Sequence, residues 1–563
     1  MSTTDNDNVY LAGDTKLEPL VFNWYAWSHL VSPVPLALNL VNRYLPMLKS
    51  FIANPAVHEA ASKNPKMLGG SFLELKRDDV VAVRALQQRM LDEGRPLLEF
   101  AEDLLKFDRG VQQSSAGYSL DGLYNDLPPS LAGLVEATYD LSNRPTLRVL
   151  EELMIDDPTT HSAPQQVAFS RVRDERRNFF LNTPRLPNDD RMILPLSFNS
   201  PAYDLIAQSR IEPVSFAAIA TALNVAQGAE RDRLRAYFSD QPPQRNEPGY
   251  AADEVRLRYF GHACVLLQTD RTSILIDPFL TWDRDDTEGR LTFHDLPDYI
   301  DYVFLTHNHQ DHFSIEVLLQ LRKRIGKILV PRNNPHSFAD PSMKLALEAM
   351  GHRNVVVMDP MDHLDLADGH LYSLPFYGEH ADLSIASKHG LFVELKGRRL
   401  LFLADSDCKD RMLYRRIRAR TGHVDHLFIG MECDGAPLSW LYGPYLGNKV
   451  TRKDDESRRL SGSDCEHAWA IVEEFGCNHI YVYAMGQEPW LRFVAGLELT
   501  ASSKQIVESD TLIQRSRDAG HHAERLLGCR TFILPPSGTA PMAKRAPGDA
   551  HGRQQAEALL AGA

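Results

Sequence analysis

The stretch LTHNHQDHFS, residues 305–314, constrains the fold more than any other part of the sequence. It places three histidines and an aspartate within six positions, from His307 to His312. The run DYVFLT before it predicts a strand, and the amphipathic segment after it predicts a helix. A turn from strand to helix lies at the carboxyl edge of a sheet, where α/β proteins bind their ligands. The stretch therefore predicts an α/β domain with a polar site at its sheet edge.

The spacing within this motif is typical of a metal site. His307 and His309 are two residues apart in extended chain, so their side chains point the same way and can share one ion. Asp311 and His312 lie at the following turn, displaced enough to serve a second ion. The alternative is a polar loop that is rich in histidine by chance, in a chain with 21 histidines. The order H-x-H-x-D-H favours the metal site.

Further candidate ligands stand where other predicted strands end. Glu379 and His380 follow LPFYG, and Asp405 follows the apolar run LLFLA, although Asp405 could also be a helix cap or a turn former. Asp277 in SILIDP precedes a proline and cannot continue a helix, so we expect it to orient a histidine ligand from behind. His262 in YFGHACV is either a structural histidine or part of the site.

The character of the sequence changes at SDQPPQRNEPGYAADE, residues 239–254. Before it, segments such as DDVVAVRALQQRMLDEGRPLLEFAEDLLKF have helical periodicity. After it, short β-branched runs alternate with helical segments, which predicts an α/β sandwich. We expect a mostly helical N-terminal domain over residues 1–240, used for dimerisation or docking, and a linker over 241–253. A catalytic α/β domain should cover 254–534, and a disordered tail 535–563.

Composition excludes several classes of protein. The net charge of −14, from 61 basic and 75 acidic residues, argues against nucleic acid as a partner. The polar, acidic start lacks the pattern of a secretory signal. The apolar region 20–52 is interrupted by three prolines and is not expected to span a membrane. Six cysteines without framework spacing fit a reducing cytoplasm.

The motifs GHACVLL, ILIDPFL, LTHNHQDH, GEH and LFLAD, in this order, resemble the metallo-β-lactamase superfamily over residues 254–534. The resemblance implies an αββα sandwich with a two-metal site at one edge. The superfamily includes hydrolases, nucleases and redox enzymes, so the fold does not decide the reaction.

The sequence departs from the zinc hydrolases of this superfamily at two places. Those hydrolases have a histidine in the third motif and another after the last core strand. Here Glu379 stands beside His380, and the last strand ends in Met485 and Gly486. If Glu379 takes the third place, oxygen ligands become prominent, which suits iron, although zinc tolerates the same set. One ion would then have His307, His309, Glu379 and Asp405, and the other Asp311, His312 and the shared Asp405.

A long helical domain before an oxygen-rich metallo-β-lactamase domain resembles the di-iron β-hydroxylases, such as that of chloramphenicol biosynthesis. Those enzymes hydroxylate the β-carbon of an amino acid held as a thioester on a carrier domain of a nonribosomal peptide synthetase. The resemblance implies two oxo- or hydroxo-bridged iron ions, dioxygen as co-substrate, an external electron donor, a carrier-domain partner and a homodimer. The family's ligand motif matches His307, His309, Asp311, His312, Glu379 and Asp405, and we then expect Asp277 and His380 to lie behind these ligands.

The segment MECDGAPLSWLYGPYL, residues 431–446, is a candidate substrate pocket. Glu432 or Asp434 could receive an amino group, and Trp440 and Tyr442 could line a pocket for an aryl side chain. The alternative is an ordinary core loop. The basic stretches LYRRIRARTGH and RDERRNFF are candidate docking surfaces for an acidic carrier domain, although basic segments are most often solvated faces.

Two other functions stay open from the sequence. The first is a zinc-dependent hydrolase such as a phosphodiesterase, in which a metal-bound hydroxide attacks and His380 rather than Glu379 is a ligand. The second is a scaffold with a vestigial metal site. The intact ligand set argues against the scaffold.

Overall fold

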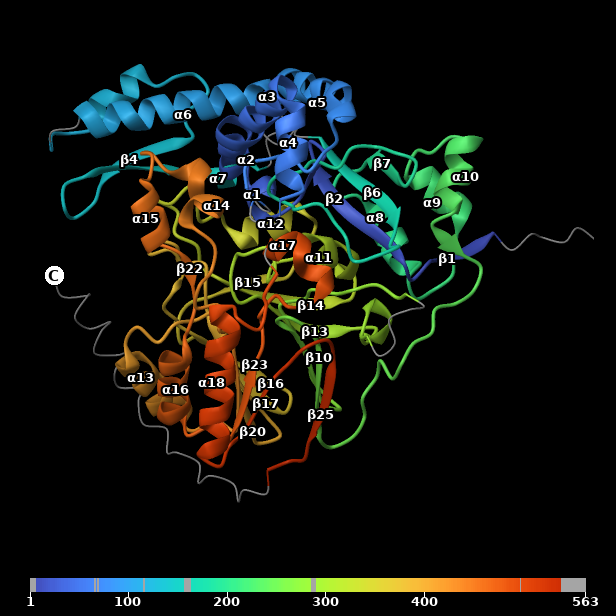
Figure 1. The fold of residues 1–563 in the computed structure, drawn as a ribbon, viewed down its shortest axis with the longest axis vertical. Coiled ribbons are helices and arrows are strands. Elements are labelled where there is room, and N and C mark those ends of the chain that lie inside the picture. Colours follow the sequence, from blue (N-terminus) through green and yellow to red (C-terminus); the bar gives the residue numbers. More distant parts are fainter. Residues whose placement is uncertain are drawn as a thin grey trace, which may run out of the picture.

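Two seven-stranded sheets form the centre of the C-terminal part of the molecule (Figure 1). The computed structural model describes residues 7–64, 67, 70–114, 117–155, 164–284, 290–496 and 498–537. The first sheet has the order β15-β14-β13-β12-β11-β10-β25, and the second has the order β16-β17-β19-β20-β21-β23-β24. The first consists of β10 (Val255–Gly261), β11 (Cys264–Gln268), β12 (Ser273–Ile276), β13 (Ile300–Phe304), β14 (Ile325–Pro331), β15 (Val355–Met358) and β25 (Arg530–Leu534). The second consists of β16 (His363–Leu366), β17 (Gly369–Leu374), β19 (Gly390–Leu395), β20 (Arg398–Phe402), β21 (His426–Ile429), β23 (His479–Val482) and β24 (His522–Arg525).

Apolar side chains hold these sheets together. Residues such as Ile274, Leu391 and Phe428 form a core between the two inner faces. A second core lies under the helices that cover the second sheet, which are α13 (Arg411–Thr421), α16 (Cys465–Phe475) and α18 (Lys504–Asp518). Helices α11 (Ile315–Leu321) and α12 (Met343–Ala349) cover the first sheet. Every residue of β12 is buried. A strand that is covered on both faces favours a continuous apolar run, and Ile274 to Ile276 supply one. This is the predicted αββα arrangement.

The N-terminal part is rich in helices, as predicted, and also contains strands that the sequence analysis did not predict. A four-stranded antiparallel sheet has the order β3-β2-β6-β7, and small sheets pair β1 with β8 and β9, and β4 with β5. The helices are α1 (Ser28–Val31), α2 (Pro33–Asn39), α3 (Leu45–Ala53), α4 (Pro55–Ser62), α5 (Val80–Glu93), α6 (Arg95–Ser114), α7 (Glu151–Met154), α8 (Pro201–Gln208), α9 (Phe216–Ala222) and α10 (Ala229–Arg235). The strands are β1 (Asn8–Leu11), β2 (Thr15–Val21), β3 (Trp24–Tyr25), β4 (Val135–Tyr139), β5 (Pro145–Val149), β6 (Gln165–Arg171), β7 (Arg191–Pro195), β8 (Val214–Ser215) and β9 (Phe238–Ser239).

The N-terminal part lies above the sandwich in Figure 1 and shares a core with it. One cluster of buried residues runs from Val9 through α2 and α6 to Val303 on β13 and Leu318 on α11. Polar contacts reinforce this seam, since the Arg322 guanidinium donates hydrogen bonds to the carbonyls of Phe198 and Ser200 at 2.7 and 2.9 Å. Helix α11, which follows the histidine motif, is therefore held from both sides.

Three further expectations concern the C-terminal tail, membrane-spanning helices and the cysteines. Most of the predicted tail, residues 538–563, lies outside the described residues. Within the described ranges, no helix combines the length and the apolar character needed to cross a membrane. All six cysteines lie within the described residues, and none of them is in a disulfide. Cys264 begins β11, and Cys465 begins α16.

Candidate metal centre

The histidine motif and the other predicted ligands meet at one end of the two sheets. His307, His309, Asp311 and His312 follow β13, and Asp405 follows β20. Glu379 lies on the short strand β18 (Glu379–His380), which pairs with β22 (Leu460–Ser461). Several non-glycine residues here have a positive φ, which costs energy and is concentrated at functional sites. They are His262 (54°), Asp277 (41°), Glu379 (69°) and Ala404 (45°).

A first cluster contains His307, His309 and Glu379, whose ligand atoms all lie within 4.8 Å of one another. His309 Nδ1 is 2.8 Å from Glu379 Oε1, and all three side chains are buried. Glu379 Oε2 and His307 Nε2 have no hydrogen-bond partner in the described part of the chain. Buried polar atoms without a partner are costly, so a cation between them would stabilise the cluster.

A second cluster contains His307, His312 and Asp405. Asp405 Oδ2 lies 3.2 Å from His312 Nε2 and 3.6 Å from His307 Nε2. Asp405 Oδ1 is buried and, among the described residues, unpaired. Because Asp405 faces histidines of both ion sets, its carboxylate has the position of a bridge between two ions.

A third cluster contains His262, Asp311 and His312. His262 Nε2 is 3.1 Å from Asp311 Oδ2, and His312 Nε2 is 3.8 Å from the same oxygen. The sequence left His262 open, and the structure places it beside the motif. His262 Nδ1 accepts a hydrogen bond from the Gly486 amide at 3.3 Å, so the proton of a neutral His262 ring is on Nε2. His262 therefore presents an N–H to Asp311 rather than a lone pair to an ion.

Asp277 and Thr306 fix the orientation of two of the histidines from behind. His312 Nδ1 lies 2.8 Å from Asp277 Oδ2, and the Thr306 hydroxyl donates to the same carboxylate oxygen at 2.6 Å. His307 Nδ1 lies 3.1 Å from that hydroxyl. With the protons on Nδ1, both rings direct the lone pair of Nε2 into the clusters. Asp277 thus contacts the His312 ring at the nitrogen that faces away from Asp405.

His380 and Tyr442 lie on the far side of His309. His309 Nε2 is 3.1 Å from His380 Nδ1 and 2.9 Å from the Tyr442 hydroxyl, which is also 2.8 Å from His380 Nδ1. His309 therefore turns Nδ1 to Glu379 and Nε2 to His380. Glu379 shares the cluster with His307 and His309, whereas His380 belongs to none of the three clusters.

The comparisons with known proteins agree with this arrangement. Residues 10–242 match the family model of the diiron non-heme beta-hydroxylase N-terminal domain, and residues 256–428 match that of a beta-lactamase superfamily domain. The 4-amino-L-phenylalanyl-[CmlP-peptidyl-carrier-protein] 3-hydroxylase of Streptomyces venezuelae is 36% identical over 532 residues, which cover 93% of this chain and 99% of that protein. The chain belongs to the diiron non-haem β-hydroxylase family.

Structural comparison supports the same assignment. The crystal structure of CmlA, a diiron β-hydroxylase from Streptomyces venezuelae, matches with a TM-score of 0.88 and 35% identity, over 94% of this chain and 99% of that one. By contrast, a metal-dependent hydrolase of Opitutus terrae is 29% identical over 152 residues, only 27% of this chain. The hydrolase alternative therefore accounts for a small part of the molecule, and the β-hydroxylase family accounts for nearly all of it.

The donor set of this diiron β-hydroxylase fits two iron ions. Burial raises the pKa of Glu379, and burial together with Asp405 and Glu379 raises the pKa of Glu432 well above its ordinary value. Burial lowers the pKa of His307, which keeps that ring neutral and able to act as a ligand. The carboxylates are thus crowded into a buried space, where bound cations would compensate their charge. Mixed imidazole and carboxylate donors suit non-haem iron.

The predicted pocket residues of this β-hydroxylase are separated by the structure. Glu432 is half-buried near the carboxylates, and Tyr442 contacts His309. Trp440 lies further out, where its ring packs edge-on to Phe179 and lines a cavity of about 480 Å³. Asp434 forms an ion pair with Arg459 at 2.9 Å, so its charge is already compensated. The sequence pattern could not say which side chains of this loop turn inward, and the structure places Glu432 and Tyr442 nearer the candidate ligands than Trp440 and Asp434.

Proposed function

We propose that this diiron enzyme hydroxylates the β-carbon of an amino acid tethered as a thioester to a carrier domain of a nonribosomal peptide synthetase. The relative from Streptomyces venezuelae, which matches over nearly its whole length, is named as a 3-hydroxylase of an aminoacyl peptidyl carrier protein. The observation that carries the proposal is the pairing of Glu379 with His307 and His309 in one cluster, while His380 stays outside it.

In this proposal, His307 Nε2, His309 Nδ1 and Glu379 would hold one iron, and His312 Nε2 and Asp311 would hold the other. Asp405, which lies near histidines of both sets, would contribute to both. Orphaned buried atoms on His307, His312, Glu379 and Asp405 support this assignment. Asp277 and Thr306 hold the ligand rings in the tautomer that binding requires.

The chemistry that a diiron centre supplies is the oxidation of a C–H bond by dioxygen. One oxygen atom enters the C–H bond and the other leaves as water, so each turnover also consumes two electrons and two protons from an external donor. The protein places the β-carbon at the centre and limits access of water. The side chains of the candidate ligands are at most 9% exposed except that of Asp311, which is 24% exposed, so substrate approaches from the side of Asp311.

Glu432 is the residue that we assign to the substrate amino group. It is half-buried, and among the described residues no histidine or arginine forms an ion pair with its carboxylate, since the nearby Arg459 pairs with Asp434. An ammonium group on the α-carbon would compensate this carboxylate and hold the β-carbon two bonds away from the anchored nitrogen. Trp440 and its cavity are the corresponding candidates for the side chain of the amino acid.

We also propose that the enzyme is a homodimer that associates through its N-terminal part. Apolar or aromatic side chains are exposed around the arm formed by α6, β4 and β5, namely Tyr118 (80%), Tyr124 (44%) and Leu141 (109%). Exposed apolar groups gathered on one arm favour association. Sedimentation equilibrium should give twice the chain mass, and replacement of the three residues by serine should give the chain mass.

The test of the proposed reaction is isotope labelling. The iron-loaded, reduced enzyme is mixed with a carrier domain that bears a phenylalanyl or 4-aminophenylalanyl thioester under ¹⁸O₂, and the amino acid is released and analysed by mass spectrometry. We expect one ¹⁸O atom on the β-carbon. Label from H₂¹⁸O instead of ¹⁸O₂, or hydrolysis of the thioester without oxidation, would contradict the proposal.

A further inference from the structure

His262 has no place in the proposed ligand set, although it lies beside Asp311. It stands in the two-residue turn between β10 and β11, where Gly261 pairs with Cys264. Its Nε2 atom is 3.1 Å from Asp311 Oδ2, and its side chain is only 3% exposed. Asp311 is the most exposed of the candidate ligands, so fewer packed neighbours restrict its carboxylate. A contact with a buried ring is therefore a means of fixing the orientation of that carboxylate.

The segment 484–488, which comes shortly after β23, holds His262 at both its backbone and its ring. The Ala484 amide donates a hydrogen bond to the His262 carbonyl at 3.0 Å. The Gly486 amide donates to the ring Nδ1 at 3.3 Å, and the His262 amide donates to Glu488 Oε1 at 2.8 Å. These contacts join a turn of the first sheet to the chain that leaves the second sheet, and they leave Nε2 to face Asp311.

Glu488 is a buried carboxylate that the ligand set does not use. It is 1% exposed, and the Tyr259 hydroxyl donates to its Oε1 atom at 2.7 Å. A buried carboxylate is costly unless it accepts hydrogen bonds, and the His262 amide and the Tyr259 hydroxyl provide two of them. Both donors come from β10 and its turn, so Glu488 fixes the end of that strand.

Both chain segments have strained backbone where they meet. His262 and Ala484 have φ values of 54°, although neither is a glycine, and Gly261 and Gly486 have values of 112° and 62°. Non-glycine residues with a positive φ cost energy, and they are concentrated at functional sites. The strain here brings the His262 ring to Asp311 and the Gly486 amide to that ring.

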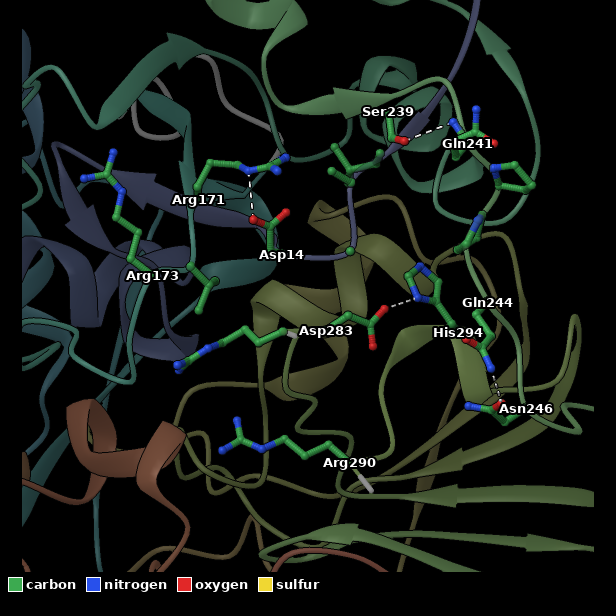
Figure 2. A pocket seen from close by; sticks show the side chains of 17 residues that line it. Asp14, Arg171, Arg173, Ser239, Gln241, Gln244, Asn246, Asp283, Arg290 and His294 are labelled. Atoms are coloured by element: carbon green, nitrogen blue, oxygen red, sulfur yellow. Dashed lines mark hydrogen bonds and ion pairs between the residues drawn. The ribbon is translucent and has the colours of Figure 1, made fainter. Parts of the chain in front are cut away.

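Trp490 packs against the same turn. A Cβ on Gly261 would lie 2.7 Å from the Trp490 ring. The Arg290 guanidinium lies over this ring, 4.5 Å from its centre, and pairs with Glu175 at 2.7 Å. Arg290 also lines a cavity of about 1010 Å³ at the seam between the N-terminal part and the sandwich (Figure 2). The turn that carries His262 is therefore supported as far as this seam.

The Gly486 amide determines what the His262 ring offers to Asp311. Because Nδ1 accepts from this amide, the neutral ring carries its proton on Nε2. An N–H that faces a carboxylate gives a stronger hydrogen bond than one between neutral groups. The His262 ring also lies edge-on to the His312 ring, with 5.0 Å between their centres. It thus contacts both residues that the proposal assigns to the second iron alone.

We propose that His262 is a positioning residue, which holds the Asp311 carboxylate in place for the second iron, and that the segment 484–488 fixes His262 for this task. The inference rests on the ligand set of the proposed function. Partners that orient a ligand from behind typically change metal affinity by about 10- to 100-fold when they are removed. We therefore expect the loss of the Nε2 proton donor to weaken one of the two irons.

The test compares two amide side chains at position 262 of the full-length, iron-loaded protein. His262→Gln can bring an amide N–H to the place of Nε2, whereas the side chain of His262→Asn is one carbon shorter and does not reach Asp311. Asparagine also tolerates a positive φ, so the turn should be retained. The control is His426→Gln, because His426 is 5% exposed and begins β21, at the end opposite to Gly430 and Asp405.

Iron retention is measured against increasing concentrations of a ferrous chelator in the absence of dioxygen. His262→Asn should release one of its two irons at about tenfold lower chelator concentration than the wild-type protein. His262→Gln and His426→Gln should match the wild-type protein. If His262→Asn also matches it, the proposal is wrong. Equal loss of iron in His262→Asn and His262→Gln would overturn it as well, and would favour His262 as a ligand.

A measurement on the unmutated chain does not depend on the folding of His262→Asn. Nitrogen-15 NMR of the histidine rings in the iron-free, full-length protein should show His262 with its proton on Nε2. The signals of His262 are assigned by their absence from His262→Gln. A proton on Nδ1 would overturn the proposal, because Nε2 would then present a lone pair to the centre.

The same proteins separate this inference from the proposed function. If the wild-type protein holds two irons and hydroxylates a carrier-bound amino acid, while His262→Asn holds iron equally well, the positioning role is wrong and the function stands. If the wild-type protein holds no iron or hydroxylates no carrier-bound amino acid, the proposed function fails and this inference fails with it.

Discussion

Glu379 and His380 are neighbours in the sequence but have different surroundings in the structure. The sequence showed that either could be a ligand, and only the short pairing of β18 with β22 decides which one turns inward. Glu379 adopts a φ of 69°, which no periodicity predicts. The motif residues His307, His309, Asp311 and His312 could be recognised as a group because they lie within six positions, whereas His262 could not be assigned because it comes from another strand end.

Replacing each of these neighbours by alanine tests the assignment. Glu379→Ala removes a carboxylate from the first cluster, so we expect the iron content to fall by at least half and hydroxylation to be lost. His380→Ala removes only a contact on the outer side of His309, so most of the iron should remain. Metal analysis after purification from iron-replete cells measures both. Loss of metal in His380→Ala with retention in Glu379→Ala would favour the hydrolase arrangement.

The absence of a side chain at Gly430 leaves room for the carboxylate of Asp405. A Cβ on Gly430 would lie 2.6 Å from Asp405 Oδ1 and 2.7 Å from the Ala404 carbonyl. Gly430→Ala should therefore displace the bridging carboxylate and lower the iron content, with little change in the far-ultraviolet circular dichroism. Gly110→Ala is the control, because nothing lies within 4 Å of a Cβ there. Equal iron content in the two variants would show that Asp405 is not held as the structure indicates.

At the scale of elements, most strands of the sandwich were predicted, because each is a short apolar run bounded by turn residues, whereas β16, β17, β24 and β25 were not. Edge strand β16 was missed, since it alternates aspartate and histidine with leucine and is exposed. Strand β2 was missed for the opposite reason. All seven of its residues are buried, so TKLEPLV has no alternation to detect. In both cases, the burial of the strand depends on which neighbouring elements cover it, and a local sequence pattern does not contain that information.

Helix α2 offers a prediction about pH. Glu151 Oε1 accepts a hydrogen bond from the Val34 amide at the start of α2, and burial raises the pKa of Glu151 to about 7. The folded protein therefore retains the proton between pH about 4.5 and 7, where the unfolded chain has released it, and stability falls as the pH rises through that window. Glu151→Gln should be about 1 kcal/mol more stable than the wild-type protein at pH 8 and equal to it at pH 4.5.

Chemical denaturation at the two pH values measures this difference. Glu152→Gln is the matched control, because the pKa of Glu151 is raised mainly by burial and only secondarily by Glu152. A Glu151→Gln variant that is less stable than the wild-type protein at both pH values would show that the carboxylate is ionised when folded.

At the scale of the whole molecule, the N-terminal part is joined to the catalytic part by a common core and by buried charges. Arg177 contacts Glu18 at 2.9 Å and Glu316 on α11 at 2.7 Å, and all three side chains are at most 4% exposed. The change in composition at the linker predicted a domain boundary, but a sequence pattern does not show which faces pack together. In the structure, the helix behind the histidine motif packs on the N-terminal sheet.

Arg177→Met tests the importance of this attachment. Removing one partner of a buried ion pair leaves Glu18 and Glu316 poorly compensated, so we expect unfolding to become easier by about 3 kcal/mol. Arg176→Met, a change at an exposed neighbour, should alter stability by less than about 0.5 kcal/mol. Urea denaturation followed by tryptophan fluorescence compares the two. Equal stability would show that the two parts are held by the apolar core alone.

The central claim is that the chain holds two redox-active iron ions. The most direct test is the metal content of protein purified anaerobically from iron-replete and from zinc-replete cells, with an optical spectrum before and after reduction and exposure to dioxygen. We predict about two irons per chain and an absorption that bleaches on reduction and returns with dioxygen. Two tightly held zinc ions and no redox-active absorption would contradict the claim.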